Sequence, residues 1–339
     1  MEEMTATACA AEFDPGETPR GGKSRTSLVV DHLPDGQPLA FPALVVRGAE
    51  PGRTLLATGV IHGDEYEGAL AIQDLFAELR PERMSGTFVG IPVVNGPAFT
   101  AGTRTGSHDH KDLARVFPGS ADGSPTERIA HAMAEYVIPC ADLYADLHSA
   151  GNDARIKQFA GYQIRPELGA TQREAAIAFG LDLVWGTVVL PGRSLSAAGD
   201  IAVPAIYVEL EGEGRGRAES CAAALQGLRN LLAYLGIVAG DYPSGPPPFL
   251  VEDDRDGSGD MGLDARAPTS GLFLPDVAVW DRVAAGDRLG VVRRADGRVA
   301  AEVRSTKAGR VLLLRTRPRV IAGDTVAYVL EPSLLPAGP

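Results

Sequence analysis

Two side chains with metal-binding chemistry, His62 and Glu65, stand three residues apart in the first quarter of the chain. The apolar run over residues 54–61 that precedes them predicts a buried strand. Residues 69–76, which follow, have apolar side chains spaced like one face of a helix. An imidazole and a carboxylate in such a strand-to-helix turn can bind one metal ion. Zinc accepts nitrogen and oxygen ligands, and a catalytic zinc usually has three protein ligands and one open position.

A third ligand is predicted much further along the chain, at His148. Residues 141–147 form another strand-like run, and His148 stands at its end. Ligands bind beyond the carboxyl ends of the strands in open α/β sheets, so a long separation in sequence is no obstacle. Each piece alone has a simpler explanation, because a lone His-x-x-Glu is often a chance match and a histidine after a strand is often a polar loop residue. Their joint occurrence at two strand ends favours a metal site.

A candidate general base follows a third apolar run, over residues 203–208. Three glutamates, Glu209, Glu211 and Glu213, come directly after it. A carboxylate in this position can exchange protons with water and with a leaving amine if it lies within hydrogen-bond reach of them. Strand alternation favours Glu209 and Glu211 on one face and Glu213 in the loop, so spacing alone does not select one of them. The alternative is an acidic surface turn.

These motifs occur in a recognisable order along the chain. The order is His62-x-x-Glu65, then Asp112-Leu113-Ala114-Arg115, then Asp146-Leu147-His148, then Val208-Glu209-Leu210. In this order they resemble the succinylglutamate desuccinylase/aspartoacylase family, which is related to the zinc carboxypeptidases. The resemblance covers roughly residues 40 to 235, and the segment after it fits as well.

The resemblance implies a hydrolase that cleaves an N-acyl amide with one Zn2+ per chain. It assigns His62, Glu65 and His148 to the zinc ion and selects Glu209 as the general acid/base. It also implies that Asp112 fixes the tautomer of a ligand histidine, which metal sites commonly require.

The resemblance further places Arg115 and Arg104 in the substrate pocket, where Arg104 would stabilise a tetrahedral oxyanion. The family has an asparagine where this chain has Ala114, and a methyl group donates no hydrogen bond. Arg115 alone can still bind a carboxylate through two parallel hydrogen bonds. Either the substrate is held differently, or it carries no carboxylate at that point. Arg193 is either a further contact for a charged substrate group or an ordinary loop arginine.

Composition narrows the classes of partner. The net charge of −12 argues against a nucleic-acid partner, because phosphate binding needs clustered Lys and Arg. The sequence contains no 18-residue apolar run, so a membrane-spanning helix is not expected. Three widely spaced cysteines favour a reducing compartment, and the start of the chain lacks the apolar core of a signal peptide. We therefore expect a cytoplasmic protein with a small-molecule substrate; a homo-oligomer remains open.

Strand-like and helix-like runs alternate over the first two thirds of the chain, which predicts an α/β fold with helices on both faces of a mixed sheet. The strands are expected at residues 26–31, 42–47, 54–61, 87–94, 142–147, 182–190 and 204–210, and the helices at 66–80, 125–138, 167–180 and 217–235. From residue 263 onward, short β-like runs alternate with turns and predict a small all-β, barrel-sandwich-like domain. The resemblance implies that the larger fold is zinc-carboxypeptidase-like.

Four segments follow from these patterns. We expect a disordered tail over 1–24, a zinc-dependent catalytic α/β domain over 25–240, a linker over 241–260 and a small β domain over 261–335. The segment before residue 25 is polar and rich in Gly, Thr and Pro, and the expected linker begins with a Pro-rich stretch at 243–248.

The resulting hypothesis is a zinc-dependent amidohydrolase that removes the acyl group from an N-acyl amino acid or a related small N-acyl amine. In it, Glu209 takes a proton from the attacking water and returns it to the departing amine. A metallocarboxypeptidase acting on short peptides would share the zinc ligands, but it depends on recognition of a terminal carboxylate, which Ala114 weakens. A non-catalytic binding protein on the same fold is the third alternative, and the presence of every metal and base residue argues against it.

Overall fold

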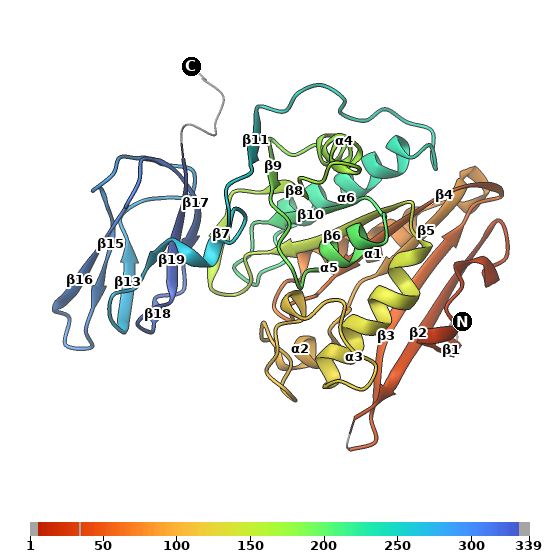
Figure 1. Ribbon diagram of the computed structural model, residues 1–339, viewed down its shortest axis with the longest axis horizontal. Helices are drawn as coiled ribbons and strands as arrows, with labels where there is room; N and C mark the ends of the chain where they lie inside the picture. The colour runs from red at the N-terminus through yellow and green to blue at the C-terminus, as the bar shows by residue number, and fades with distance from the viewer. Residues whose placement is uncertain (1–5, 34, 332–339) are drawn as a thin grey trace.

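The computed structural model describes residues 6–33 and 35–331, apart from the side chain of residue 263, and its main feature is a large mixed β-sheet (Figure 1). Within this described part, ten strands form the sheet in the order β1-β2-β3-β5-β4-β6-β10-β8-β9-β11. The central strands β5, β4, β6 and β10 are parallel to one another. The strands are β1 Ala6–Cys9, β2 Gly22–His32, β3 Pro38–Arg47, β4 Glu50–Gly59, β5 Ser85–Ile91, β6 Leu143–Ser149, β8 Phe159–Gln163, β9 Leu183–Thr187, β10 Ala205–Leu210 and β11 Phe249–Asp253.

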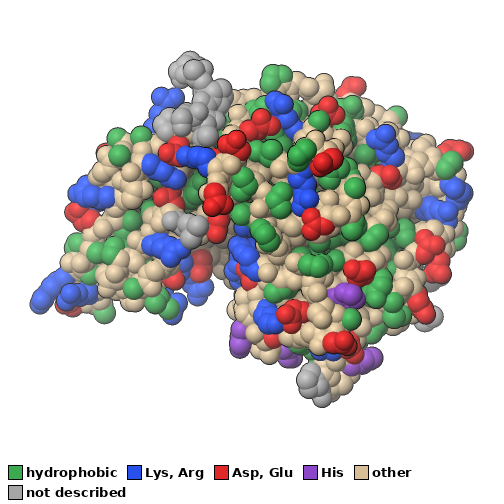
Figure 2. All heavy atoms as spheres, in the orientation of Figure 1, with side chains coloured by type: hydrophobic (Ala, Val, Ile, Leu, Met, Phe, Trp, Pro, Cys, Tyr) green, Lys and Arg blue, Asp and Glu red, His purple; other side chains and the backbone are tan. Residues whose placement is uncertain are grey.

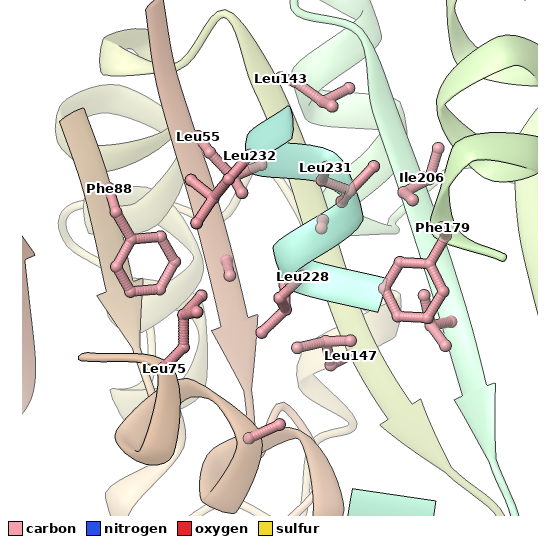
Figure 3. Packing of buried hydrophobic residues seen from close by; sticks show 14 of the residues in the cluster. Leu55, Leu75, Phe88, Leu143, Leu147, Phe179, Ile206, Leu228, Leu231 and Leu232 are labelled. Carbon is pink, nitrogen blue, oxygen red and sulfur yellow. The ribbon is translucent and has the colours of Figure 1, made fainter. Parts of the chain in front are cut away.

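Helices cover both faces of this sheet. Successive residues of a strand point to opposite sides, so each central strand supplies apolar side chains to both layers of helices. On one face, Leu55 of β4 packs in the cluster that includes Leu75 and Leu228 (Figure 3). On the other face, its neighbour Leu56 packs in the cluster that includes Ile129. The helices are α1 Glu67–Glu78, α2 Gly96–Ala101, α3 Pro125–Ala132, α4 Gly169–Phe179, α5 Ser194–Asp200 and α6 Ala218–Tyr234. None of the helices in the described residues has the length and apolar character needed to cross a membrane.

The C-terminal part of the chain forms two antiparallel sheets, as predicted. In the described residues one sheet has the order β12-β19-β17-β14, and the other has the order β16-β15-β13-β18. Phe273, Val311 and Val326 lie in the apolar core of this region. The strands are β12 Ala265–Arg266, β13 Gly271–Pro275, β14 Arg282–Val283, β15 Arg288–Arg293, β16 Val299–Arg304, β17 Gly309–Arg315, β18 Arg319–Val320 and β19 Thr325–Leu330.

A strand from the first part of the chain joins this C-terminal region. β7, Ala154–Ile156, begins five residues after β6 and pairs with β17 in antiparallel register. The segment that follows His148 therefore runs from the main sheet, where β6 ends, to the C-terminal sheet, where β7 pairs with β17. Figure 2 shows these parts as two lobes lying side by side with a notch between them.

The expectation of a disordered tail is wrong for residues 6–24. β1 pairs in parallel with β2, and two short 3-10 helices, Ala10–Glu12 and Pro15–Glu17, follow it. Ala10 is buried and Phe13 packs against the same apolar cluster, which gives this polar segment a reason to be ordered. The expectation for residues 1–5 lies outside the described residues.

The expected linker over 241–260 is also corrected by the structure. β11 lies within it and pairs in parallel with β9 at the edge of the main sheet. Val251 is fully buried and packs in a cluster with Trp185 and Phe249, so the apolar side chains of this short segment hold the strand against the sheet.

Candidate metal centre

The turn that carries His62 is held in place by its surroundings. Directly after β4, Val60 has a φ of 53°, a conformation that β-branched residues rarely adopt. The buried Asn95 supports this turn, since its Nδ2 donates a hydrogen bond to the Ile61 carbonyl at 3.1 Å. A Cβ at Gly63 would lie 2.0 Å from the backbone of α2, so only glycine fits there. The turn therefore presents His62 in a fixed position.

The structure brings the three predicted ligands together. His62 Nδ1 lies 2.7 Å from Glu65 Oε1, and His148 Nδ1 lies 3.0 Å from Glu65 Oε2. The nitrogen and oxygen atoms that can act as ligands all lie within 4.8 Å of one another. His62 and Glu65 are only 4% and 3% exposed. This cluster could hold a metal ion.

The opposite nitrogen of each imidazole faces an aspartate. His62 Nε2 lies 3.1 Å from Asp112 Oδ1, and His148 Nε2 lies 3.2 Å from Asp146 Oδ2. An imidazole that donates its Nε2–H to a carboxylate keeps a lone pair on Nδ1 for a metal ion. Because both Nδ1 atoms face Glu65, the arrangement fits metal coordination.

The electrostatics agree with this arrangement. Burial alone would raise the pKa of Glu65, but the charges of His62 and His148 outweigh burial and hold that pKa well below its usual range. Burial would lower the pKa of His148, yet Asp146 and Glu65 raise it well above its usual value. Two imidazoles and Arg104 thus stand among three carboxylates, and carboxylates that favour the protonated form of an imidazole so strongly would also attract a metal cation in place of the protons.

Asp146 is a positioning residue whose role the sequence motif did not reveal. It stands two residues before His148, on the same face of β6, and it is completely buried. Thr58 Oγ1 donates a hydrogen bond to Asp146 Oδ1 at 2.6 Å, and the Ser194 hydroxyl donates to Asp146 Oδ2. The sequence does show that Asp146 and His148 are two residues apart and therefore share one face of a strand. The hydrogen bonds from Thr58 and Ser194 to Asp146 depend on distant parts of the chain and leave no such signal.

We expect Asp146→Asn to weaken metal binding by roughly 10- to 100-fold, because an amide holds the His148 ring in its ligating orientation less well. Asp112→Asn should have a smaller effect, since the Asp112 side chain is 21% exposed and that of Asp146 is 1% exposed. Competition with a metal-binding dye measures both affinities. Equal affinity in wild type and Asp146→Asn would show that Asp146 does not position His148.

Glu209 lies beside the cluster, and the other two candidate glutamates do not. Glu209 is opposite His148 in the pairing of β10 with β6, and it lines the same cavity. Burial raises the pKa of Glu209 to about 7; His148 acts against this rise and Glu65 adds to it. Glu211 instead forms an ion pair with Arg155 at 2.9 Å.

The expectation that Glu209 and Glu211 share one face of a strand is therefore wrong. β10 ends at Leu210, and Gly212, with a φ of 90°, turns the chain away. Glu213, as expected, lies in the loop, where it forms an ion pair with Arg217.

A cavity of about 440 Å³ opens from the cluster and contains the predicted arginines. Arg104 Nε donates to Asp112 Oδ2 at 3.0 Å, and its Nη1 lies 3.7 Å from Glu65 Oε1. Arg115 and Arg193 line the same cavity, and no ion pair links either of them to a carboxylate within residues 6–33 and 35–331.

Arg115 and Arg193, the two arginines without a carboxylate partner, are held next to each other by backbone packing. A Cβ at Gly192 would lie 2.4 Å from the Arg115 carbonyl oxygen, so the loop before α5 packs directly on the 3-10 helix Leu113–Arg115. Arg193 follows Gly192, and its buried Nε atom has no hydrogen-bond partner. Ala114 lines the cavity beside them. The sequence did not single out Tyr207 or Asp260, which also line this cavity.

Comparison with known proteins gives consistent matches. The model of the succinylglutamate desuccinylase/aspartoacylase catalytic domain matches residues 51–235. The chain is 34% identical over 297 residues to N-alpha-acetyl-L-2,4-diaminobutyric acid deacetylase of Halomonas elongata. The aligned region covers 86% of this chain and 85% of that protein. A crystal structure of a succinylglutamate desuccinylase from Silicibacter sp. superposes with a TM-score of 0.84 at 28% identity, covering 96% of this chain and 99% of that chain. The product-bound ectoine utilization protein EutE of Ruegeria pomeroyi gives a TM-score of 0.81 at 31% identity, covering 92% of this chain and 96% of that chain.

Proposed function

The chain belongs to the succinylglutamate desuccinylase/aspartoacylase family, and from this premise we propose that it is a zinc-dependent hydrolase that deacylates N-acyl amino acids. One observation carries the proposal. The metal-binding cluster, a buried glutamate and two arginines without carboxylate partners all line one cavity. The relative from Halomonas elongata is named as a deacetylase of an N-acetyl amino acid, which agrees with this reading.

His62, Glu65 and His148 would hold the zinc ion, because two imidazole nitrogens and a carboxylate oxygen are a common ligand set of catalytic zinc. When bound, zinc supplies a Lewis acid for the amide carbonyl and makes water more acidic. Asp112 and Asp146 would keep both imidazoles in the tautomer that leaves Nδ1 free.

Glu209 would move the protons of the reaction. It accepts a proton from water as the water oxygen forms a bond to the amide carbon, and it returns this proton to the nitrogen as the C–N bond breaks. Burial favours this role, because a carboxyl with a pKa of about 7 can both accept and donate a proton near neutrality. Arg104 stands beside Glu65 and would stabilise the negative charge that develops on the carbonyl oxygen.

Arg115 and Arg193 would bind the carboxylate of the substrate. Two adjacent guanidinium groups repel each other, and a carboxylate between them removes this repulsion and accepts several hydrogen bonds. Arg193 would therefore supply the second donor that Ala114 cannot provide. The same pair could bind the C-terminal carboxylate of a short peptide. A carboxypeptidase is therefore the alternative activity that an experiment must distinguish from deacylation.

A substrate panel tests the proposed function. Zinc-loaded protein is incubated with N-acetyl and N-succinyl amino acids, with dipeptides, and with N-acetyl amino acids whose carboxylate is converted to an amide. We expect free amino acid to be released fastest from the N-acyl amino acids. Faster cleavage of the dipeptides would favour the carboxypeptidase, and no cleavage of any compound would favour a binding protein.

The carboxylate contact gives a prediction for Arg193→Met. We expect KM for an N-acyl amino acid to rise by roughly 10- to 100-fold, since a hydrogen bond to a charged group contributes ~1.5–3 kcal/mol. The matched substrate with a carboxamide in place of the carboxylate should show a much smaller change. Steady-state kinetics on both substrates measures the difference. Equal changes in KM for both compounds would mean that Arg193 does not contact the carboxylate.

A further inference from the structure

Tyr207 is an aromatic residue that stands two positions before Glu209 on β10, so both side chains point to the same face of the sheet. Both residues line the cavity. Tyr207 is opposite Asp146 in the pairing of β10 with β6, whereas Glu209 is opposite His148. Tyr207 therefore stands on the sheet side of the cavity, one row further from the metal-binding cluster than Glu209.

The Tyr207 ring is held in one position by its neighbours. It lies over Gly161 of β8, where a Cβ would stand 2.1 Å from Tyr207 Cε1 and 2.7 Å from its hydroxyl oxygen. Because only glycine leaves this space, the ring can extend across β8. The buried Phe159 packs against the ring in an edge-to-face contact, with 5.5 Å between the two ring centroids. The position of the hydroxyl group is therefore fixed before any ligand binds.

The loop that carries Arg193 is anchored on the same row of the sheet. The hydroxyl of Ser194, the next residue, donates a hydrogen bond to Asp146, which is opposite Tyr207. Burial raises the pKa of the Tyr207 hydroxyl, the Glu209 carboxylate adds to the rise, and the Arg193 guanidinium acts against it. Tyr207 thus lies within electrostatic reach of both groups, and its hydroxyl keeps its proton at neutral pH.

We propose that Tyr207 contacts the substrate and that its hydroxyl donates a hydrogen bond to the carboxylate bound by Arg193. The inference rests on the proposed function, which places the scissile nitrogen at Glu209 and the carboxylate at Arg115 and Arg193. A molecule that reaches from Glu209 to Arg193 lies along the part of the cavity wall that contains Tyr207.

A neutral hydroxyl is well suited to this position. A carboxylate offers about four acceptor positions, so it can take a further donor beside two guanidinium groups. A third cation would add to the repulsion between the arginines, whereas a hydroxyl adds a donor without adding charge. Because the ring is already fixed, little conformational entropy is lost when the hydrogen bond forms. Tyr207 thus favours substrates that carry a carboxylate over the corresponding amides, since the charged acceptor makes the stronger hydrogen bond.

Tyr207→Phe tests the inference, because it removes the hydroxyl and keeps the ring. Zinc-loaded variant and wild type are compared on the N-acyl amino acid that the substrate panel shows to be hydrolysed fastest, and on the same compound with a carboxamide in place of the carboxylate. We expect KM for the carboxylate compound to rise by roughly 10- to 100-fold, the loss expected for a hydrogen bond to a charged group, while kcat changes much less. KM for the carboxamide should rise much less.

Tyr162→Phe is the matched control. Tyr162 follows Gly161 on β8 and points to the opposite face of the sheet. Its ring also lies over a glycine, Gly186 of β9, where a Cβ would stand 2.7 Å from Tyr162 Cζ, and its hydroxyl donates a hydrogen bond to Glu252. Within the described residues Tyr162 is not part of the cavity wall, so its variant should keep the wild-type KM for both compounds.

Calorimetric titration gives a readout that does not depend on turnover. The probes are the free amino acid released from the same substrate, and the amide of that amino acid. We expect Tyr207→Phe to bind the free amino acid at least about 10-fold more weakly than wild type does, and to bind the amide with a much smaller change.

Four results would overturn the inference. Unchanged kinetics in Tyr207→Phe would show that the hydroxyl makes no contact with the substrate. An equal rise in KM for both compounds would show that the contact is not with the carboxylate. A fall in kcat at unchanged KM would show that the hydroxyl acts on the reacting atoms instead. In these three cases the proposed deacylation would stand, whereas hydrolysis of no N-acyl amino acid by wild type would overturn the proposed function and this inference with it.

Discussion

Replacing His148 with alanine is expected to remove the metal ion and the activity together. His148 supplies one of three predicted ligand atoms, and its Nδ1 lies 3.0 Å from Glu65 Oε2. Loss of a group that merely positions a ligand costs ~10- to 100-fold in metal affinity, so loss of a ligand itself should cost more. His62→Ala should behave in the same way. Elemental analysis after dialysis, together with turnover of an N-acyl amino acid, measures both effects.

The control for this prediction is His108→Ala. His108 is an exposed histidine outside the cavity, and its substitution should leave metal content and turnover as in wild type. Full retention of the metal in both His62→Ala and His148→Ala would show that the cluster is not the metal site. A folded variant is recognised by an unchanged circular dichroism spectrum.

For Glu209→Gln we expect the metal to stay and turnover to fall by ~10²- to 10⁴-fold, the usual contribution of a general base. Glutamine keeps the shape of the side chain but neither accepts nor returns the proton. Glu211→Gln is the matched control, because Glu211 pairs with Arg155 and lines a different cavity. Wild-type turnover in Glu209→Gln with loss in Glu211→Gln would reverse the assignment.

The pH dependence should identify the same group. A general base must be deprotonated, so kcat/KM should fall as the pH drops through the pKa of Glu209. Burial raises that pKa to about 7, and a nearby metal cation favours the carboxylate and acts in the opposite direction. The acid limb is therefore expected at or below pH 7. A pH profile of kcat/KM measures it, and an acid limb at the same pH in Glu209→Gln would assign it to another group.

Much of the catalytic region could be predicted because its signals are local. Leu55 and Leu56 lie on opposite faces of β4, as the strand-like run over 54–61 implied for a buried strand. The helices expected over 66–80, 167–180 and 217–235 correspond to α1, α4 and α6. The helix expected over 125–138 is α3 followed by a π-helical turn, Met133–Val137. The closeness of His62, Glu65 and His148 could be predicted because β4 and β6 are neighbouring parallel strands that end at one edge of the sheet.

Three of the strands that were missed depend on pairing with distant parts of the chain. β8 is a five-residue strand in which Gly161 leaves room for the ring of Tyr207, so its own residues give a weak strand pattern. β7 has three residues and is stabilised by β17, which lies more than 150 residues away in the sequence. β11 follows a Pro-rich stretch that is typical of linkers. No local period marks any of these strands.

The far wall of the cavity was missed for the same reason. Asp260 lies in what reads as a polar loop rich in glycine, and only folding places that loop between β9 and β19. Arg193 could be noted in the sequence but not distinguished from an ordinary loop arginine. The close packing of Gly192 on the backbone of Arg115 is what puts it beside the other arginine.

We propose that this cavity deacylates N-acyl amino acids with one zinc ion bound by His62, Glu65 and His148. The most direct test is to remove metal from the protein with a chelator and to titrate zinc back while hydrolysis of an N-acetyl amino acid is followed. We expect little activity without metal and a linear rise that ends at about one zinc per chain. Full activity in metal-free protein, or no gain in activity as zinc is added, would contradict the account.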